Sequence, residues 1–236
     1  MSISKAFTFL FEDDEWIVKI AIAAVLTLIP IVGWIPLIGW MLEIGRRVAT
    51  GRADVLPAWD DLSTYAIRGI KAFVVSLVYA IPYLLLFSCA YGLPWLAASL
   101  QVSEGVHTIF NIVSIAATCV NLVYYIFMAL VVPAALMRFT MNDDNITAGL
   151  AFKEVLTLVK DNLPAYFTIF LGNLILSLIM PLGALILCVG IFFTVPYSVA
   201  VLGHLYGQAY AEATGGGIVP TGTPPAAPAA SADWEG

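Results

Sequence analysis

The sequence predicts an all-α protein: a polytopic transmembrane helix bundle with five or six membrane segments and additional interfacial amphipathic helices. Of its 236 residues, 61% are hydrophobic and 11% are charged, with a mean hydropathy of +0.95, whereas soluble domains carry about 25% charged residues. The charges lie outside long apolar windows; residues 162–211, for example, contain no acidic or basic side chain except His204. Because a helix needs about 20 apolar residues to cross a bilayer, these windows are long enough to be membrane spans.

Composition and motifs argue against several function classes. The ten Lys and Arg residues form no dense basic run, so nucleic-acid binding is not expected. Cys89, Cys119 and Cys188 lie far apart inside apolar windows and are interpreted as small buried side chains, not as a disulfide framework or a metal site. There is no His-Glu-x-x-His, no Gly-x-Ser-x-Gly and no phosphate-binding glycine loop. We therefore expect no enzymatic activity, no cofactor and no metal.

The N-terminal part contains an interfacial segment and an ambiguous membrane segment. Residues 1–15 are predicted to form an interfacial amphipathic N-terminus, because the apolar stretch is too short to span. The helical membrane domain is predicted over residues 16–212, and its first apolar run is interrupted by Pro30, Gly33, Pro36 and Gly39. This run is either one kinked span or a hairpin of two short helices, over about 17–31 and 36–50. The hairpin is the favoured interpretation, and it would place the N-terminus on the cytoplasmic side.

Further helices follow along the chain. The pattern predicts one from about residue 61 to 91, closed by Gly92, Pro94 and the polar stretch Gln101–Glu104, and a longer one over 106–138. In residues 146–160 the apolar side chains face away from the charged ones, as expected for an amphipathic helix in the membrane plane. Two more spans are predicted at 163–181 and 184–211, joined by a turn at Pro181-Leu182-Gly183. The Pro/Ala/Gly-rich tail, residues 213–236, is predicted to be disordered.

The distribution of basic residues predicts the orientation. Two connections are basic, whereas the loop around 92–106 and the turn at 181–183 contain no base. Because cytoplasmic loops are enriched in Lys and Arg, the basic connections and the C-terminal tail are expected in the cytoplasm. The basic residues of the two connections are Arg46, Arg47, Arg52, Arg68 and Lys71, and Arg138, Lys153 and Lys160.

Three acidic pairs, Asp13-Asp14, Asp60-Asp61 and Asp143-Asp144, each precede a predicted amphipathic helix. Paired carboxylates can bind a divalent metal. The alternative, which we favour, is that they cap helix N-termini by accepting free backbone N–H groups.

A polar stripe marks the long helix over 106–138. Its members step by three or four residues and fall within an arc of about 80° at about 100° per residue. A polar stripe on a membrane helix must face the bundle interior, because lipid offers no hydrogen-bond partners. It could line a small-molecule permease or pore, but interhelical hydrogen bonding is favoured because no acid or lysine accompanies it. The stripe residues are His107, Asn111, Ser114, Thr118, Asn121 and Tyr125.

The last predicted helix carries a small-residue motif. Gly203 and Gly207 are four residues apart, a spacing that permits close approach of a second helix. His204 and Gln208 lie beside them and are interpreted as hydrogen-bonded helix-packing residues.

Several short motifs point to one family. In the first half these are Phe11-Glu12-Asp13-Asp14-Glu15-Trp16, Ile38-Gly39-Trp40, Gly45-Arg46-Arg47, Leu56-Pro57-Ala58-Trp59-Asp60-Asp61 and Tyr79-Ala80-Ile81-Pro82. The second half adds Thr194-Val195-Pro196-Tyr197 and His204-Leu205-Tyr206-Gly207-Gln208. In these motifs, over about residues 5–212, the chain resembles an uncharacterised prokaryotic membrane protein family, domain of unknown function 4013. That family usually carries Gly-Tyr where this chain has Gly39-Trp40. The resemblance implies a bacterial or archaeal plasma (inner) membrane and assigns no activity.

The sequence thus predicts a multi-pass integral membrane protein. Its role is expected to be that of a non-enzymatic membrane scaffold or accessory subunit; the alternative is a permease or pore lined by the polar face at 107–125. The expected partners are the lipid bilayer and other membrane proteins or a second copy of the chain, and not nucleic acid.

Overall fold

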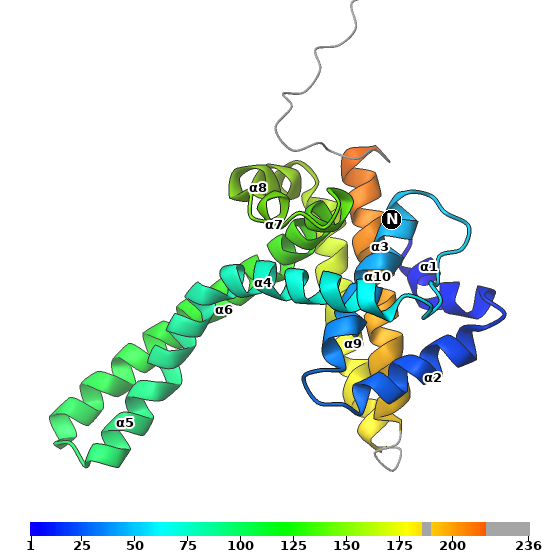
Figure 1. Cartoon of the computed structure of the whole chain (residues 1–236). Helices are drawn as coiled ribbons and strands as arrows, with labels where there is room; N and C mark the ends of the chain where they lie inside the picture. The colour runs from blue at the N-terminus through cyan, green and yellow to red at the C-terminus, as the bar shows by residue number, and fades with distance from the viewer. Residues whose placement is uncertain (186–189, 216–236) are drawn as a thin grey trace, which may run out of the picture.

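The computed structural model describes residues 1–185 and 190–215, and in this part of the chain the fold is entirely helical (Figure 1). The helices are α1 (Ile3–Thr8), a 3₁₀ turn η1 (Phe9–Glu12), α2 (Trp16–Thr27), α3 (Trp34–Ala49), α4 (Leu62–Phe87), a π-helical turn η2 (Ser88–Gly92), α5 (Leu93–Leu100), α6 (Glu104–Met141), α7 (Ile146–Gly149), α8 (Phe152–Asp161), α9 (Leu163–Leu185) and α10 (Ile191–Thr214).

The helices form a core and a projecting arm. In the core, α3, α9 and α10 run side by side, with α1 and α2 on one side and α7 and α8 near one end (Figure 1). The arm is a helical hairpin formed by the end of α4, η2, α5 and the first part of α6, and it extends away from the core. With 38 residues, α6 is about 57 Å long at about 1.5 Å per residue, so it reaches from the arm tip into the core.

The ambiguous first membrane segment is a hairpin, as the favoured interpretation predicted. The helices α2 and α3 are separated by a turn in which Ile31 has a φ of 67°. Pro30 lies in this turn, and Pro36 lies in the first turn of α3, where proline is tolerated because the N–H it lacks would have no helical partner. The 12 residues of α2 extend about 18 Å, which is shorter than a bilayer core of about 30 Å.

Three predicted boundaries are wrong. Pro181 lies inside α9, which continues to Leu185, so the turn is not at 181–183. Pro94 lies in the first turn of α5, and the helical path from α4 continues through η2 to Leu100. The single amphipathic helix over 146–160 is two helices, α7 and α8, separated at residues 150–151.

Among the described residues, three helical stretches are long and apolar enough to cross a membrane: Leu62–Leu100, Glu104–Met141 and Leu163–Gly183. These support a membrane-embedded protein, but they do not confirm the predicted count of five or six segments. The predicted tail at 213–236 begins inside α10, which runs to Thr214, and its residues 216–236 lie outside the described part.

The central helix α3 packs closely against α4 and α10 at glycine positions. A Cβ atom on Gly203 would lie 2.3 Å from the Met41 carbonyl oxygen, and one on Gly207 would lie 2.3 Å from that of Gly45. On another side of α3, a Cβ atom on Gly39 would lie 1.9 Å from the carbonyl oxygen of Tyr65 in α4. The predicted role of Gly203 and Gly207 in helix packing thus has a defined partner, the backbone of α3.

We predict that Gly203→Ala destabilises the protein by about 1–3 kcal/mol, because the added methyl group must push α10 away from α3. The change in unfolding midpoint is measured with the detergent-solubilised protein. The matched control is Gly105→Ala in α6, where an added Cβ meets nothing within 4 Å and helix propensity gains about 0.5–1 kcal/mol. Equal effects of the two substitutions would contradict close packing at Gly203.

Candidate functional site

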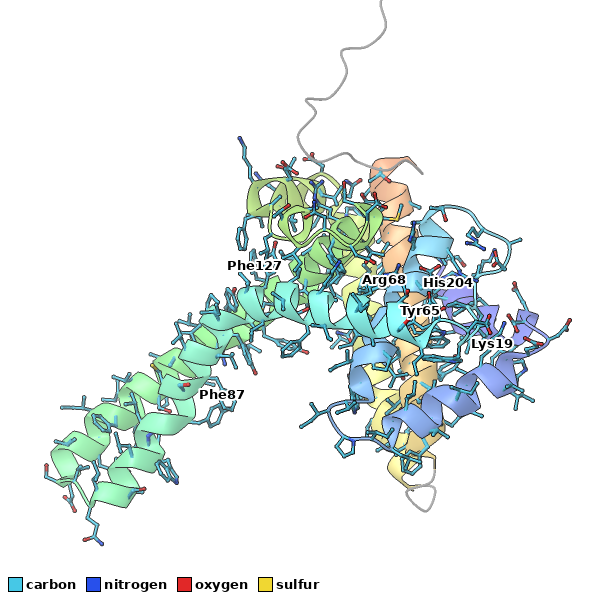
Figure 2. The ribbon with its side chains drawn as sticks, viewed as in Figure 1. Lys19, Tyr65, Arg68, Phe87, Phe127 and His204 are labelled. Atoms are coloured by element: carbon cyan, nitrogen blue, oxygen red, sulfur yellow. The ribbon has the colours of Figure 1, made fainter. Side chains whose placement is uncertain are left out.

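A cluster of charged side chains joins α3, α4 and the α6–α7 connection. Its centre is Arg68, at the point where α4 passes the core (Figure 2). Arg68 of α4 is only 3% exposed. Its Nη1 donates to Glu43 Oε2 of α3 at 2.6 Å, and its Nε donates to Asp144 Oδ1 and Oδ2 at 2.9 and 3.0 Å. A buried guanidinium is costly unless it is paired and hydrogen-bonded, and both conditions are met here.

The cluster continues along α3 into the following loop. Arg47 donates to Glu43 at 3.1 Å and to Asp54 at 2.9 Å, and Arg52 donates to Asp54 at 2.8 Å. The hydrogen bond from Arg52 holds the pKa of the Asp54 carboxyl below its usual range. Residues from α3, the loop, α4 and the α6–α7 connection therefore form one ion-paired network.

The acidic pairs divide between capping and ion pairing. Asp61 caps α4 by accepting the Thr64 N–H at 3.0 Å, as predicted, and hydrogen bonds from the Thr64 side chain and N–H lower the pKa of Asp61. Asp13 accepts the Glu15 N–H at 2.9 Å and pairs with Lys19 at 2.7 Å. The capping prediction is wrong for Asp144, which binds Arg68, while the adjacent Asn145 caps α7. It is also wrong for α2, whose N-cap residue is Glu15 and which has no side-chain cap hydrogen bond.

A second buried base lies on α6. Arg138 of α6 is 2% exposed and pairs with Glu154 of α8. Its Nε has no hydrogen-bond partner among the described residues, and the same is true of the Tyr166 hydroxyl on α9. From the sequence, Arg138 and Arg68 were identified only as basic residues of the two connections. The signal that could have indicated burial is the uncharged residues that directly precede and follow each arginine.

The structure divides the polar stripe of α6. Asn121 is buried, but Asn111, Thr118 and Tyr125 are exposed on the arm, so the prediction that the whole stripe faces the bundle interior is wrong for these three. The His107 ring bonds Asn111 at 3.0 Å within the same helix. Ser114 crosses the arm and donates to the Ala90 carbonyl of η2.

The cysteines of the arm also differ from expectation. Cys89 and Cys119 are exposed, whereas they were predicted to be buried; Cys188 lies outside the described residues. Within residues 1–185 and 190–215, no three His, Cys, Asp or Glu side chains group as a metal site.

His204 and Gln208 connect α10 to the N-terminal segment. The His204 side chain is buried, and its ring lies 4.5 Å from that of Phe9, centroid to centroid. Gln208 Nε2 bonds His204 Nδ1 at 3.0 Å, and the Gln208 amide also bonds the backbone of Ser2. The predicted packing role therefore includes a hydrogen-bonded histidine at the junction with α1 and η1.

Comparison with known protein families finds one match. A family model described as a protein of unknown function (DUF4013) matches residues 22–209, which is well over half of the chain. The chain belongs to this family. The description of DUF4013 assigns no biochemical role. Neither the curated proteins nor the solved structures contain a match.

The Leu56–Asp61 motif, which carried the resemblance to DUF4013, has a structural explanation. Trp59 stacks on Trp40 of α3 at 5.0 Å and donates from Nε1 to the Lys19 carbonyl of α2 at 2.9 Å. Trp40 in turn donates to the Pro57 carbonyl at 3.0 Å. The motif thus fastens the loop before α4 to both α2 and α3, and Asp61 at its end caps α4.

We predict that Arg68→Met destabilises this DUF4013 protein by about 3 kcal/mol, because Glu43 and Asp144 would remain partly buried without their cation. The unfolding midpoint in mixed micelles reports the change. Arg52→Met serves as the control: it also removes an arginine from the network, but that side chain is 52% exposed, so the midpoint should stay close to wild type. An Arg68→Met midpoint equal to that of the control would show that the cluster does not stabilise the fold.

Proposed function

We propose that this DUF4013 protein is a non-enzymatic membrane scaffold or accessory subunit whose arm packs against a transmembrane helix of another membrane protein. The observation that supports this most directly is the presence of two exposed polar side chains, Asn111 and Thr118, in the stretch 109–123 of α6, where the other exposed side chains are apolar.

The arm surface is suited to a membrane. In the most apolar stretch of each arm helix, only 17% of the residues are buried. Exposed residues include Ile112 at 62%, Ile115 at 66% and Leu122 at 62%. Lipid tails solvate such side chains as well as a protein does, so apolar exposure alone does not require a partner.

The polar residues provide the reason for a protein partner. Asn111, Ile115 and Thr118 lie at i, i+4 and i+7 and share one exposed helix face. An amide that faces hydrocarbon has no partner for its remaining hydrogen-bonding capacity. A neighbouring helix with a polar or small residue at this level would satisfy it, at about 0.6–2 kcal/mol per contact.

The proposed location is a prokaryotic plasma membrane, with the C-terminal end of α10 on the cytoplasmic side. The basic loop after α3, the α6–α7 connection and the end of α10 gather at one end of the core, while the arm tip and the α2–α3 turn point the other way (Figure 1). This distribution fits the positive-inside rule.

We predict that Asn111→Leu weakens the proposed helix contact about three- to thirtyfold, the equivalent of about 0.6–2 kcal/mol. A photo-crosslinking residue at Ile115 is used in native cells, and the yield of its adduct with a single membrane protein is compared between variants. Ile112→Leu is the control, because it keeps an apolar side chain at an exposed neighbouring position. Adducts with lipid only, or an unchanged adduct in Asn111→Leu, would contradict the proposal.

The orientation makes a separate prediction. In a background without native cysteines, a cysteine at Ser103 on the arm tip should react with a membrane-impermeant thiol reagent in intact cells. A cysteine at Asp161, at the end of α8, should react only after lysis. The reverse pattern would invert the proposed topology.

A further inference from the structure

A small polar pocket lies between the N-terminal segment, the loop after α3 and α10. Its volume is about 210 Å³, and its lining includes Lys5, Glu12, Asp54 and His204. The pocket lies away from the arm, and it shares only Arg52 and Asp54 with the outer end of the ion-paired network that includes Arg68. Its combination of charged side chains and a buried histidine is unusual in a chain with so few charges.

Hydrogen bonds determine which nitrogen of His204 carries the proton. The Ser2 N–H donates to Gln208 Oε1 at 2.8 Å, and Gln208 Nε2 donates to the Ser2 carbonyl at 3.2 Å. The orientation of the amide is therefore fixed, and its Nε2 must also donate to His204 Nδ1 at 3.0 Å. Nδ1 is an acceptor, so the hydrogen of the neutral ring is on Nε2. Among the described residues no group accepts a hydrogen bond from this Nε2–H, which is therefore the donor that the buried side chain offers to a ligand.

The remaining charges of the pocket are of both signs. Asp13 is paired with Lys19, and Asp54 is paired with Arg47 and Arg52. Lys5 and Glu12 have no ion-pair partner in residues 1–185 and 190–215. The pocket therefore offers one free ammonium, one free carboxylate and one N–H donor, a set that matches a zwitterion containing a phosphate and an amine.

An apolar groove begins close to this pocket. It has a volume of about 390 Å³ and runs between α2 and the start of α10, lined by Trp16, Ile20, Ala24 and Phe193. Trp16 lies three residues after Asp13, which lines the polar pocket, and the Trp16 N–H donates to the Asp13 carbonyl at 3.2 Å. A polar pocket beside an apolar groove matches the two parts of a phospholipid, a headgroup and an acyl chain.

We propose that this pocket binds a zwitterionic phosphate ester, the phosphoethanolamine headgroup of a phospholipid. The phosphate accepts hydrogen bonds from His204 Nε2–H and from the Lys5 ammonium, and the amine pairs with Glu12. The acyl chain lies along the groove between α2 and α10.

The test uses the purified full chain in detergent, titrated separately with phosphatidylethanolamine, phosphatidylglycerol, diacylglycerol and water-soluble O-phosphoethanolamine. Thermal stabilisation reports the dissociation constant for each. Saturable binding of phosphatidylethanolamine, with weaker binding of the other two lipids, is expected. If O-phosphoethanolamine displaces phosphatidylethanolamine at a similar concentration, the soluble phosphate ester is sufficient for binding. If it does not displace the lipid, the ligand of the pocket is the phospholipid. Equal binding of diacylglycerol or phosphatidylglycerol would overturn the proposal.

Three variants connect the binding to the pocket. Lys5→Met and His204→Phe should each weaken phosphatidylethanolamine binding about tenfold, the loss expected for a charge-assisted hydrogen bond. Glu12→Gln should weaken phosphatidylethanolamine binding but not that of phosphatidylglycerol. Lys160→Met, an exposed lysine on α8, is the control for charge. If His204→Phe does not fold, the exposed positions Lys5 and Glu12 still decide the outcome, and unchanged affinity in both of these variants would refute the site.

Discussion

The close contact of α3 with two other helices determines where the rest of the core lies. Gly39 and Gly69 let the backbones of α3 and α4 meet, and Gly45, Gly203 and Gly207 do the same for α3 and α10. In lipid, where apolar side chains gain little by leaving the solvent, such backbone contacts and interhelical hydrogen bonds hold helices together. Because α3 is held from two sides, Glu43 on this helix is presented to Arg68 of α4.

The buried ion pairs depend on this arrangement and strengthen it. Arg68 and Arg138 are almost fully buried, in a chain with 11% charged residues. Each is bound by an acid from another element, so their desolvation is offset only when α3, α4, the α6–α7 connection and α8 are correctly placed. The Arg68 cluster lies on α4 before the arm begins, and it therefore anchors the base of the arm to the core (Figure 2).

The arm and the polar pocket represent two ways in which the chain can interact with its membrane. The arm exposes long apolar faces with a few polar side chains, which suits lipid and a neighbouring helix. The pocket is closed by the N-terminal segment, whose Phe9 ring contacts the His204 ring in a tilted arrangement and whose Ser2 backbone orients Gln208. Thus the same segment that covers the core also completes the pocket.

Local sequence patterns determined the helical class, the apolar stretches, the Asp61 cap and the small-residue face at Gly203 and Gly207, because each depends on residues close together in the chain. They did not determine that Pro181 and Pro94 are accommodated within or at the start of helices, since tertiary packing overrides local propensity. They also could not show that Asp144 binds Arg68, 76 positions away, or that half of the α6 stripe lies on an exposed arm. Which side of a helix is buried is decided by its neighbours, and only the tertiary structure supplies them.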